Sequence, residues 1–130
     1  MASIFTKIIN KEIPGHIVAE DDKNIAFLDI NPLVVGHTLC VPKKEIDYIY
    51  DLNDEDFIAL QLFAKKVAGA IRKAIPCKRI GEAVIGLEVP HTHVHLIPIS
   101  EMDDMNFSRP KLRPTQAELA DAAKKISECL

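Results

Sequence analysis

The chain has 130 residues, 48% of them hydrophobic and 27% charged, and this balance predicts one globular domain that spans residues 1–130. Its 16 basic and 19 acidic residues give a net charge of −3. That charge argues against a nucleic-acid-binding protein, because such a protein needs a basic face to meet the phosphate backbone. A small phosphate-bearing ligand is still compatible with it, since a local site can bind an anion on an acidic protein.

Neither the cysteines nor the N-terminal segment indicates export. The cysteines Cys40, Cys77 and Cys129 are odd in number and widely spaced, so they predict no disulfide framework and no CxxC metal clip. The first fifteen residues hold only short apolar pairs broken by charges, and no later segment is apolar enough to span a membrane. We therefore expect a cytoplasmic protein with reduced thiols and no membrane partner.

The first half of the chain predicts three strands and a helix. Residues 16–20, 25–30 and 37–43 are rich in β-forming residues and are separated by polar turns, which indicates an antiparallel sheet. Residues 54–75 then place apolar side chains at helical spacing. Asn53 can cap this helix at its start, and Pro76 ends it.

The second half predicts two more strands and a second helix. Residues 79–87 and 91–98 have strand character, and Pro90 between them marks a turn. Residues 101–113 are polar and predict a surface connection. Thr115 begins a capping box that opens the last helix. The order βββ-α-ββ-α predicts an α+β domain in which the long helix covers one sheet face and the other face is free to hold a site.

Three of the five histidines lie at every second position of "HTHVHLIPI", residues 91–99. Side chains alternate across a strand, so His91, His93 and His95 are expected on one face. His37 opens an earlier predicted strand and can join them if the two strands are neighbours. A single histidine on a strand is usually structural, but three at this period indicate a site.

Two kinds of site fit this pattern. Neutral imidazoles can bind zinc, but three successive residues on one face of a flat strand span about 13 Å. Only two of the three, together with His37, could then converge on one ion. Alternatively, the middle residue His93 attacks phosphorus, while the flanking imidazoles orient it and protonate the leaving group. The spacing favours this second arrangement.

The run "HTHVHLIPI" resembles the signature of the histidine triad (HIT) family, and the chain is most similar to its small Hint-like branch. "IFTKIINKEIP", "EDDKNIAFLDINP" and "GHTLCVPK" resemble successive blocks of that family in the same order. The resemblance covers residues 4–99 and leaves 100–130 as a C-terminal connection and helix. It implies a five-stranded antiparallel sheet with a packed central helix, a homodimer, and no cofactor or metal.

The resemblance also implies a nucleotide-binding hydrolase or transferase. Family members cleave nucleoside monophosphate conjugates, such as purine nucleotide phosphoramidates, at the α-phosphate through a covalent nucleotidyl-histidine. On this chain, His93 would be the nucleophile, and His95 would contact the phosphate and assist the leaving group. His91 and His37 would complete the hydrogen-bonded set of imidazoles.

The segment "AFLDI" matches the part of the family that holds the nucleoside. Asp29 matches a residue that accepts hydrogen bonds from the ribose hydroxyls, and Phe27 and Ile30 match positions that line the base pocket. By their sequence context alone, Asp29 would be a turn cap and Phe27 a core residue.

One departure from the family lies just before the triad. Many members have a Gly-Gln pair in a loop that holds the phosphate, but here Leu87 replaces the glutamine and Glu88 adds a carboxylate. The backbone N–H groups of Leu87, Glu88 and Val89 could still serve the phosphate. The altered loop supports an alternative hypothesis, a nucleotide-binding regulatory protein with little catalysis.

Overall fold

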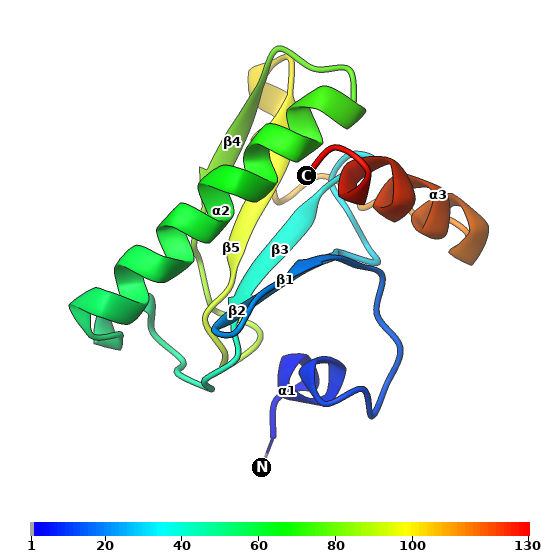
Figure 1. Cartoon of the computed structure of the whole chain (residues 1–130). Coiled ribbons are helices and arrows are strands. Elements are labelled where there is room, and N and C mark those ends of the chain that lie inside the picture. Colours follow the sequence, from blue (N-terminus) through cyan, green and yellow to red (C-terminus); the bar gives the residue numbers. More distant parts are fainter. Residues whose placement is uncertain (1) are drawn as a thin grey trace.

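The computed structural model describes residues 2–130 and contains one five-stranded antiparallel sheet, which confirms the predicted α+β class. The strands lie in the spatial order β1-β2-β3-β5-β4, so β1 and β4 are the edges (Figure 1). No helix within residues 2–130 is long and apolar enough to cross a membrane. In chain order the strands are β1 (Ile17–Glu20), β2 (Asn24–Leu28), β3 (Thr38–Pro42), β4 (Arg79–Ala83) and β5 (Val94–Ile99).

The long helix α2 (Asp54–Ala74) crosses one face of the sheet, as the sequence predicts (Figure 1). The side chain of Asn53 caps it by accepting a hydrogen bond from the backbone N–H of Asp56 at 2.8 Å. Its apolar stripe provides about a third of the buried core residues on this side. The buried members of that stripe are Leu60, Phe63, Ala64, Val67, Ala70 and Ile71.

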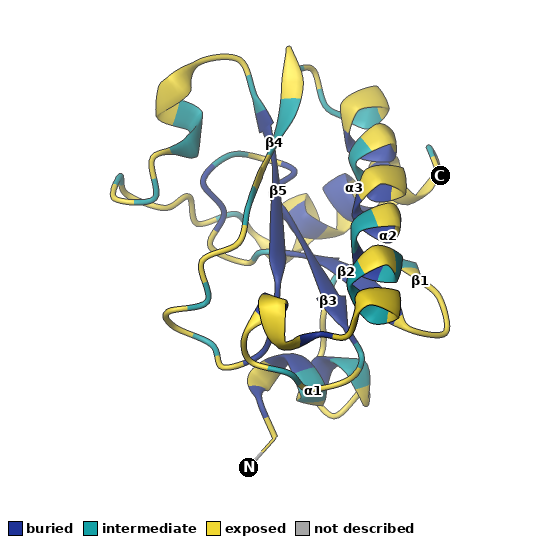
Figure 2. Cartoon of the chain, turned by 90° about the vertical axis from the view of Figure 1, so that its left-hand side faces the viewer, coloured by how far each residue is buried: buried dark blue, intermediate teal, exposed yellow. Residues whose placement is uncertain are grey.

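The C-terminal helix α3 (Gln116–Ser127) lies on the same side of the sheet as α2. Its start is the predicted capping box, in which Thr115 Oγ1 accepts from the Glu118 N–H and Glu118 Oε1 accepts from the Thr115 N–H. Figure 2 shows the buried faces of both helices turned toward the strands and their exposed faces turned outward. The two helices therefore leave the opposite sheet face to other segments.

A short helix that the sequence analysis did not predict, α1 (Ile4–Ile9), covers part of that opposite face. Phe5 and Ile8, three residues apart, are buried there in a cluster with Phe27 of β2 and Leu39 of β3. A helix of six residues is too short to be stable alone. It forms because the sheet buries its apolar side chains, and Ser3 caps its first turn.

The strands around the histidine run differ from the prediction. The strand predicted at 79–87 ends at Ala83, and the strand predicted at 91–98 begins only at Val94. Gly86 has a φ of +73°, which turns the chain out of extended geometry. Residues 84–93 are therefore a loop, and only the last of the three histidines lies on a strand.

The connection from β5 to α3 crosses the site face of the sheet. It begins with a 3₁₀ turn, η2 (Met102–Met105). A Cβ atom added to Gly81 would lie 2.8 Å from Met105 Sδ, so the glycine permits this turn to approach β4 closely. Further along, the Leu112 N–H donates to the Pro32 carbonyl at 2.9 Å. This segment was predicted to be a surface connection, but it also forms one wall of the site described below.

Two leucines of α2 provide a matched test of this architecture. Leu60 is fully buried against the sheet, whereas Leu62 on the same helix is 61% exposed. We expect Leu60→Ala to lower the free energy of unfolding by about 2–5 kcal/mol, because it leaves a cavity in the core. Leu62→Ala is expected to change it by about 0.5 kcal/mol or less. Urea unfolding at one fixed protein concentration measures both, and equal losses would contradict the packing described here.

Candidate active site

A cavity of about 210 Å³ opens on the sheet face opposite α2. Five separate segments form it: the end of β2, the residue before β3, the loop 84–93, β5 and the connection after η2. Chain segments that are far apart in sequence meet there because β3 and β5 are neighbours in the sheet. Its lining residues are Asp29, His37, Ile85, Gly86, Leu87, Glu88, His93, His95, Phe107 and Lys111.

Hydrogen bonds fix the tautomers of His37 and His95. The backbone N–H of Leu33 donates to Nδ1 of His37 at 3.1 Å, so the proton of the neutral His37 ring must be on Nε2. That Nε2–H donates to Nδ1 of His95 at 2.9 Å. His95 in its neutral form therefore carries its own proton on Nε2, the ring nitrogen left free to meet a ligand.

His93 is held in the opposite tautomer. Its Nδ1 lies 2.8 Å from the backbone carbonyl of His91, and because a carbonyl only accepts, Nδ1 carries the proton. Nε2 of His93 therefore has a free lone pair. The His93 and His95 rings are 4.9 Å apart between centroids. In their neutral forms the two rings thus place a nitrogen with a lone pair beside a nitrogen that donates, and the roles of nucleophile and leaving-group donor that the sequence analysis gave to this pair stay a prediction.

His91 does not line the cavity. Its Nε2 donates to the carbonyl of Pro42 at 2.7 Å, and its Nδ1 lies 2.7 Å from Oγ of Ser3. Glu45 completes this cluster by accepting from the backbone N–H of Ser3 at 2.6 Å. The expectation that all three histidines project together from one flat strand was wrong, because the chain is not yet extended at His91. This residue instead anchors α1 and presents the carbonyl that orients His93.

Burial keeps these rings uncharged at neutral pH. It is the main cause that lowers the pKa of His37 to about 3 and that of His95 to about 4, with the charges of neighbouring imidazoles and Lys111 adding to the effect. Burial also lowers the pKa of His91, although the hydrogen bond to Pro42 opposes it. The tautomers described above for His37 and His95 are therefore those of the neutral rings.

Asp29 serves both the turn and the cavity. One carboxylate oxygen accepts from the backbone N–H of Asn31 at 2.9 Å, which is the turn-capping role that its sequence context predicts. The other lies 3.8 Å from Nε2 of His37. Burial raises the pKa of Asp29, while the hydrogen bond from Asn31 opposes that shift. One side of the carboxylate thus stays open to a ligand.

The structure does not bring Phe27 and Ile30 into the cavity lining. Phe27 is 2% exposed and packs edge-on against Phe5 of α1, with ring centroids 5.4 Å apart. Ile30 is 57% exposed and lies beyond the end of β2. Phe27 supports the site from beneath, since Phe5 in turn contacts the His93 ring with centroids 5.0 Å apart.

The loop that replaces the Gly-Gln pair borders the cavity. Leu87 is 88% exposed, Glu88 is also exposed, and Val89 is partly buried against the α1 cluster. Within residues 2–130, the backbone N–H groups of these three residues make no hydrogen bond. They are free to bind an anion at the mouth of the cavity.

Besides Ile85 and Gly86 of the loop, the sequence analysis missed two lining residues from the C-terminal connection, Phe107 and Lys111. The Phe107 ring lies edge-on to that of His95, with centroids 5.0 Å apart. Nζ of Lys111 donates to the carbonyl of Phe107 and lies 5.9 Å from the centre of its ring. Segment 101–113 has no helix or strand period, so the sequence gave no signal for which of its side chains turns inward.

Three lining residues could also hold a metal ion. One ligand atom from each of Asp29, His37 and His95 lies within 4.8 Å of the others. This set differs from the predicted one, in which His37 joined two members of the triad. A metal bound there would compete with the hydrogen bond from His37 to His95, because Nδ1 of His37 already accepts from Leu33 and only its Nε2 is left to bind an ion.

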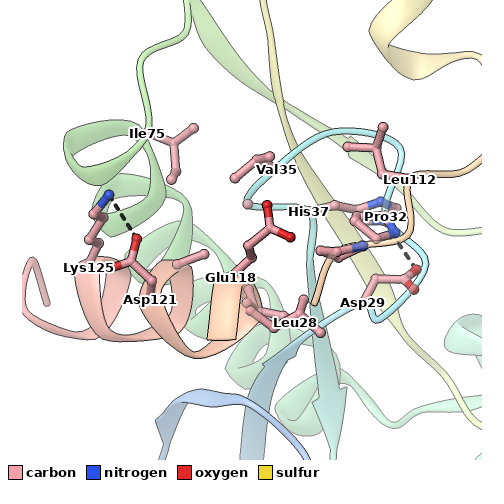
Figure 3. Close-up of a pocket in the computed structure, with 14 residues that line it drawn as sticks. Leu28, Asp29, Pro32, Val35, His37, Ile75, Leu112, Glu118, Asp121 and Lys125 are labelled. Atoms are coloured by element: carbon pink, nitrogen blue, oxygen red, sulfur yellow. Dashed lines mark ion pairs between the residues drawn. The ribbon is translucent and has the colours of Figure 1, made fainter. Parts of the chain in front are cut away.

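A second cavity, of about 180 Å³, adjoins the first between the loop after β2 and α3 (Figure 3). Asp29 and His37 line both cavities, but His93 and His95 line only the first. Its walls include Leu28, Ile75 and Leu112, and the Lys125–Asp121 ion pair lies at its rim. The paired imidazoles of His93 and His95 therefore belong to the first cavity.

The buried His37 makes stability depend on pH. Its pKa of about 3 lies below the ordinary value of 6.5, so between these values the unfolded chain binds a proton that the folded chain does not. The free energy of unfolding is therefore not reduced by His37 above pH 6.5. As the pH falls from 6.5 toward 3, protonation of His37 in the unfolded chain lowers that free energy by up to about 1.4 kcal/mol per pH unit. We expect urea unfolding between pH 6.5 and 5 to show a steeper loss of stability in the wild type than in His37→Gln. Parallel curves would contradict the burial of a neutral ring.

Comparisons with known proteins identify similar sequences over most of the chain. A sequence model described as the HIT domain matches residues 10–102. An uncharacterized HIT-like protein of Borreliella burgdorferi is 41% identical over 113 residues, which are 82% of this chain and 81% of that protein. Adenosine 5'-monophosphoramidase HNT1 of Saccharomyces cerevisiae is 37% identical over 98 residues, which are 75% of this chain and 62% of HNT1.

A solved structure gives the same result for the fold. The crystal structure of a Hit-like protein from Bartonella henselae, described as involved in cell-cycle regulation, matches with a TM-score of 0.85 and 34% identity. The match covers 98% of this chain and 96% of the other. The signature residues, the sheet topology and these matches together show that the chain belongs to the HIT family.

Proposed function

We propose that this protein hydrolyses conjugates of purine nucleoside monophosphates, such as phosphoramidates, at the α-phosphate through a covalent nucleotidyl-His93. The observation that carries this proposal is the pair of opposite tautomers. His93 presents a lone pair on Nε2, and His95 presents an N–H on the neighbouring ring. A nucleophile beside a proton donor is what the displacement of an amine from phosphorus requires.

In the first step, Nε2 of His93 forms a bond to phosphorus, and the bond from phosphorus to the leaving nitrogen breaks. The electron pair of that bond stays on the nitrogen, which accepts a hydrogen bond from Nε2–H of His95 as it leaves and takes its proton from solvent. His95 stays neutral throughout, because its Nδ1 continues to accept from Nε2–H of His37. The carbonyl of His91 holds the Nδ1 proton of His93.

In the second step, water attacks the phosphorus and the bond to His93 breaks. The electron pair of that bond returns to Nε2 of His93, the attacking water gives a proton to solvent, and the nucleoside monophosphate leaves. The proton taken from solvent in the first step is thereby returned, and no metal takes part.

The rest of the cavity suits the two ends of such a substrate. The open side of the Asp29 carboxylate would accept hydrogen bonds from the ribose hydroxyls, and the free N–H groups of the loop 87–89 would bind phosphate oxygens. Glu88 lines the cavity and would favour a leaving group that carries positive charge. We further propose that the protein acts as a homodimer in the cytoplasm, as its family resemblance implies.

The test of covalent catalysis is the removal of the nucleophile. We expect His93→Ala to lower kcat/KM for adenosine 5'-phosphoramidate by at least about 10³-fold, because no other lining group can form the intermediate. Intact-mass spectrometry of the wild type mixed with this substrate and quenched at low pH is expected to show one adenylyl group per chain. The adduct must be missing from His93→Ala, and a wild type that turns over with no adduct would overturn the covalent route.

A chelator separates the competing hypotheses. Activity that survives metal removal is expected for the mechanism above, because no step uses an ion. Activity that returns only when zinc is added back would instead indicate the metal site at Asp29, His37 and His95. Tight nucleotide binding without turnover would favour the alternative hypothesis, a nucleotide-binding regulatory protein. Leu87, which stands where many family members have a glutamine, is the reason to test for that outcome.

A further inference from the structure

The cavity lacks positive charge except at one residue. Among the described residues that line it, Lys111 is the only lysine or arginine, whereas Asp29 and Glu88 both carry carboxylates. His37 and His95 are neutral at physiological pH because burial lowers their pKa values. An anionic phosphate bound beside these carboxylates needs a countercharge, since charges interact strongly where water is largely excluded.

The loop on the other wall does not supply that charge. Leu87 has no side-chain donor, and Glu88 would repel a phosphate. The backbone N–H groups of this loop can donate hydrogen bonds, but they carry only partial charge. A cationic side chain from elsewhere in the fold is therefore the remaining source of full positive charge.

The connection after η2 holds Lys111 in place at this wall. Arg109 fixes the connection by donating to the Leu33 carbonyl at 2.6 Å and to Asp103 Oδ2 at 3.1 Å. On the other side of Lys111, the Leu112 N–H donates to the Pro32 carbonyl at 2.9 Å. The ammonium group itself donates to the carbonyl of Phe107, whose ring is edge-on to His95.

Lys111 can still bind a ligand in this position. An ammonium group has three donors, and the Phe107 carbonyl uses one of them. Its positive charge already contributes to the lowered pKa values of His37 and His95, after the larger effect of burial, and it opposes the raised pKa of Asp29. The charge therefore acts on the region where a substrate phosphate would lie.

We propose that Lys111 binds the substrate phosphate directly and supplies the side-chain donor that Leu87 cannot. This inference rests on the proposed function, because it assigns a ligand group to the same cavity. It also gives the C-terminal connection a role in substrate binding: a segment outside the matched HIT domain, which ends at residue 102, completes the phosphate site.

Binding of two ligands that differ only by the phosphate tests this assignment. NMR titration with adenosine 5'-monophosphate and with adenosine measures dissociation constants into the millimolar range. In Lys111→Met, which keeps the aliphatic stem but loses the charge, we expect the monophosphate to bind about tenfold more weakly or worse, because a charge-assisted hydrogen bond is lost. Binding of adenosine is expected to stay unchanged, and Lys111→Arg is expected to retain most of the affinity for the monophosphate.

Lys124→Met is the matched control, because Lys124 is an exposed lysine on α3 that lines neither cavity. It is expected to bind both ligands as the wild type does. Lys111→Gln serves as a second neutral variant if the methionine lowers the melting temperature.

Three results would overturn the inference. They are unchanged binding of the monophosphate in both neutral variants, an equal loss for the two ligands, and an equal loss in Lys124→Met. If the wild type itself binds no adenosine 5'-monophosphate, the proposed function fails together with this inference. If the wild type binds it and forms the adduct at His93, but Lys111 has no effect, only this inference fails.

Discussion

The hydrogen bond from the backbone N–H of Leu33 to Nδ1 of His37 is the constraint on which the rest of the site depends. It places the His37 proton on Nε2, and His37 in turn places the His95 proton on the nitrogen that faces the cavity. The carbonyl of the same leucine accepts from Arg109, which fixes the C-terminal connection. One residue of a loop therefore sets both the protonation pattern of the imidazoles and the position of the opposite wall.

The two faces of the sheet have different roles: one packs the core and the other carries the cavity. The face under α2 and α3 is apolar, and Val94 and Leu96 of β5 belong to that core. His95 lies between these two residues and faces the other way, so it is held by a strand whose neighbours are fully packed. A rigid support matters for the proposed reaction, because displacement at phosphorus would require His93 and His95 to keep their geometry. Burying the neutral imidazoles of His37 and His95 costs stability at low pH, but it keeps the hydrogen bond between them intact at neutral pH.

The polar groups beneath the site connect it to the N-terminal helix. Ser3, Thr6 and Glu45 form a hydrogen-bonded cluster around His91, and the Thr6 hydroxyl and Ser3 N–H lower the pKa of Glu45 to about 2. His91 thus joins α1 to β3, through the carbonyl of Pro42, and presents its own carbonyl to His93. In this chain the first histidine of the signature supports the second and does not meet the ligand cavity.

The sequence by itself determined the order of the five strands and the two longer helices, and the family, because hydrophobic period, capping residues and the spaced histidines are local signals; the roles of His93 and His95 stay a prediction. Those signals could not reveal α1, which is stable only when the sheet buries Phe5 and Ile8. They also could not show that the chain turns at Gly86 and becomes extended only at Val94, which removes His91 from the cavity. Lys111 became visible only in the tertiary structure, since its approach to His95 depends on hydrogen bonds from Arg109 and Leu112 to a loop about 76 residues earlier. Contacts across such distances arise from packing, and no local pattern encodes them.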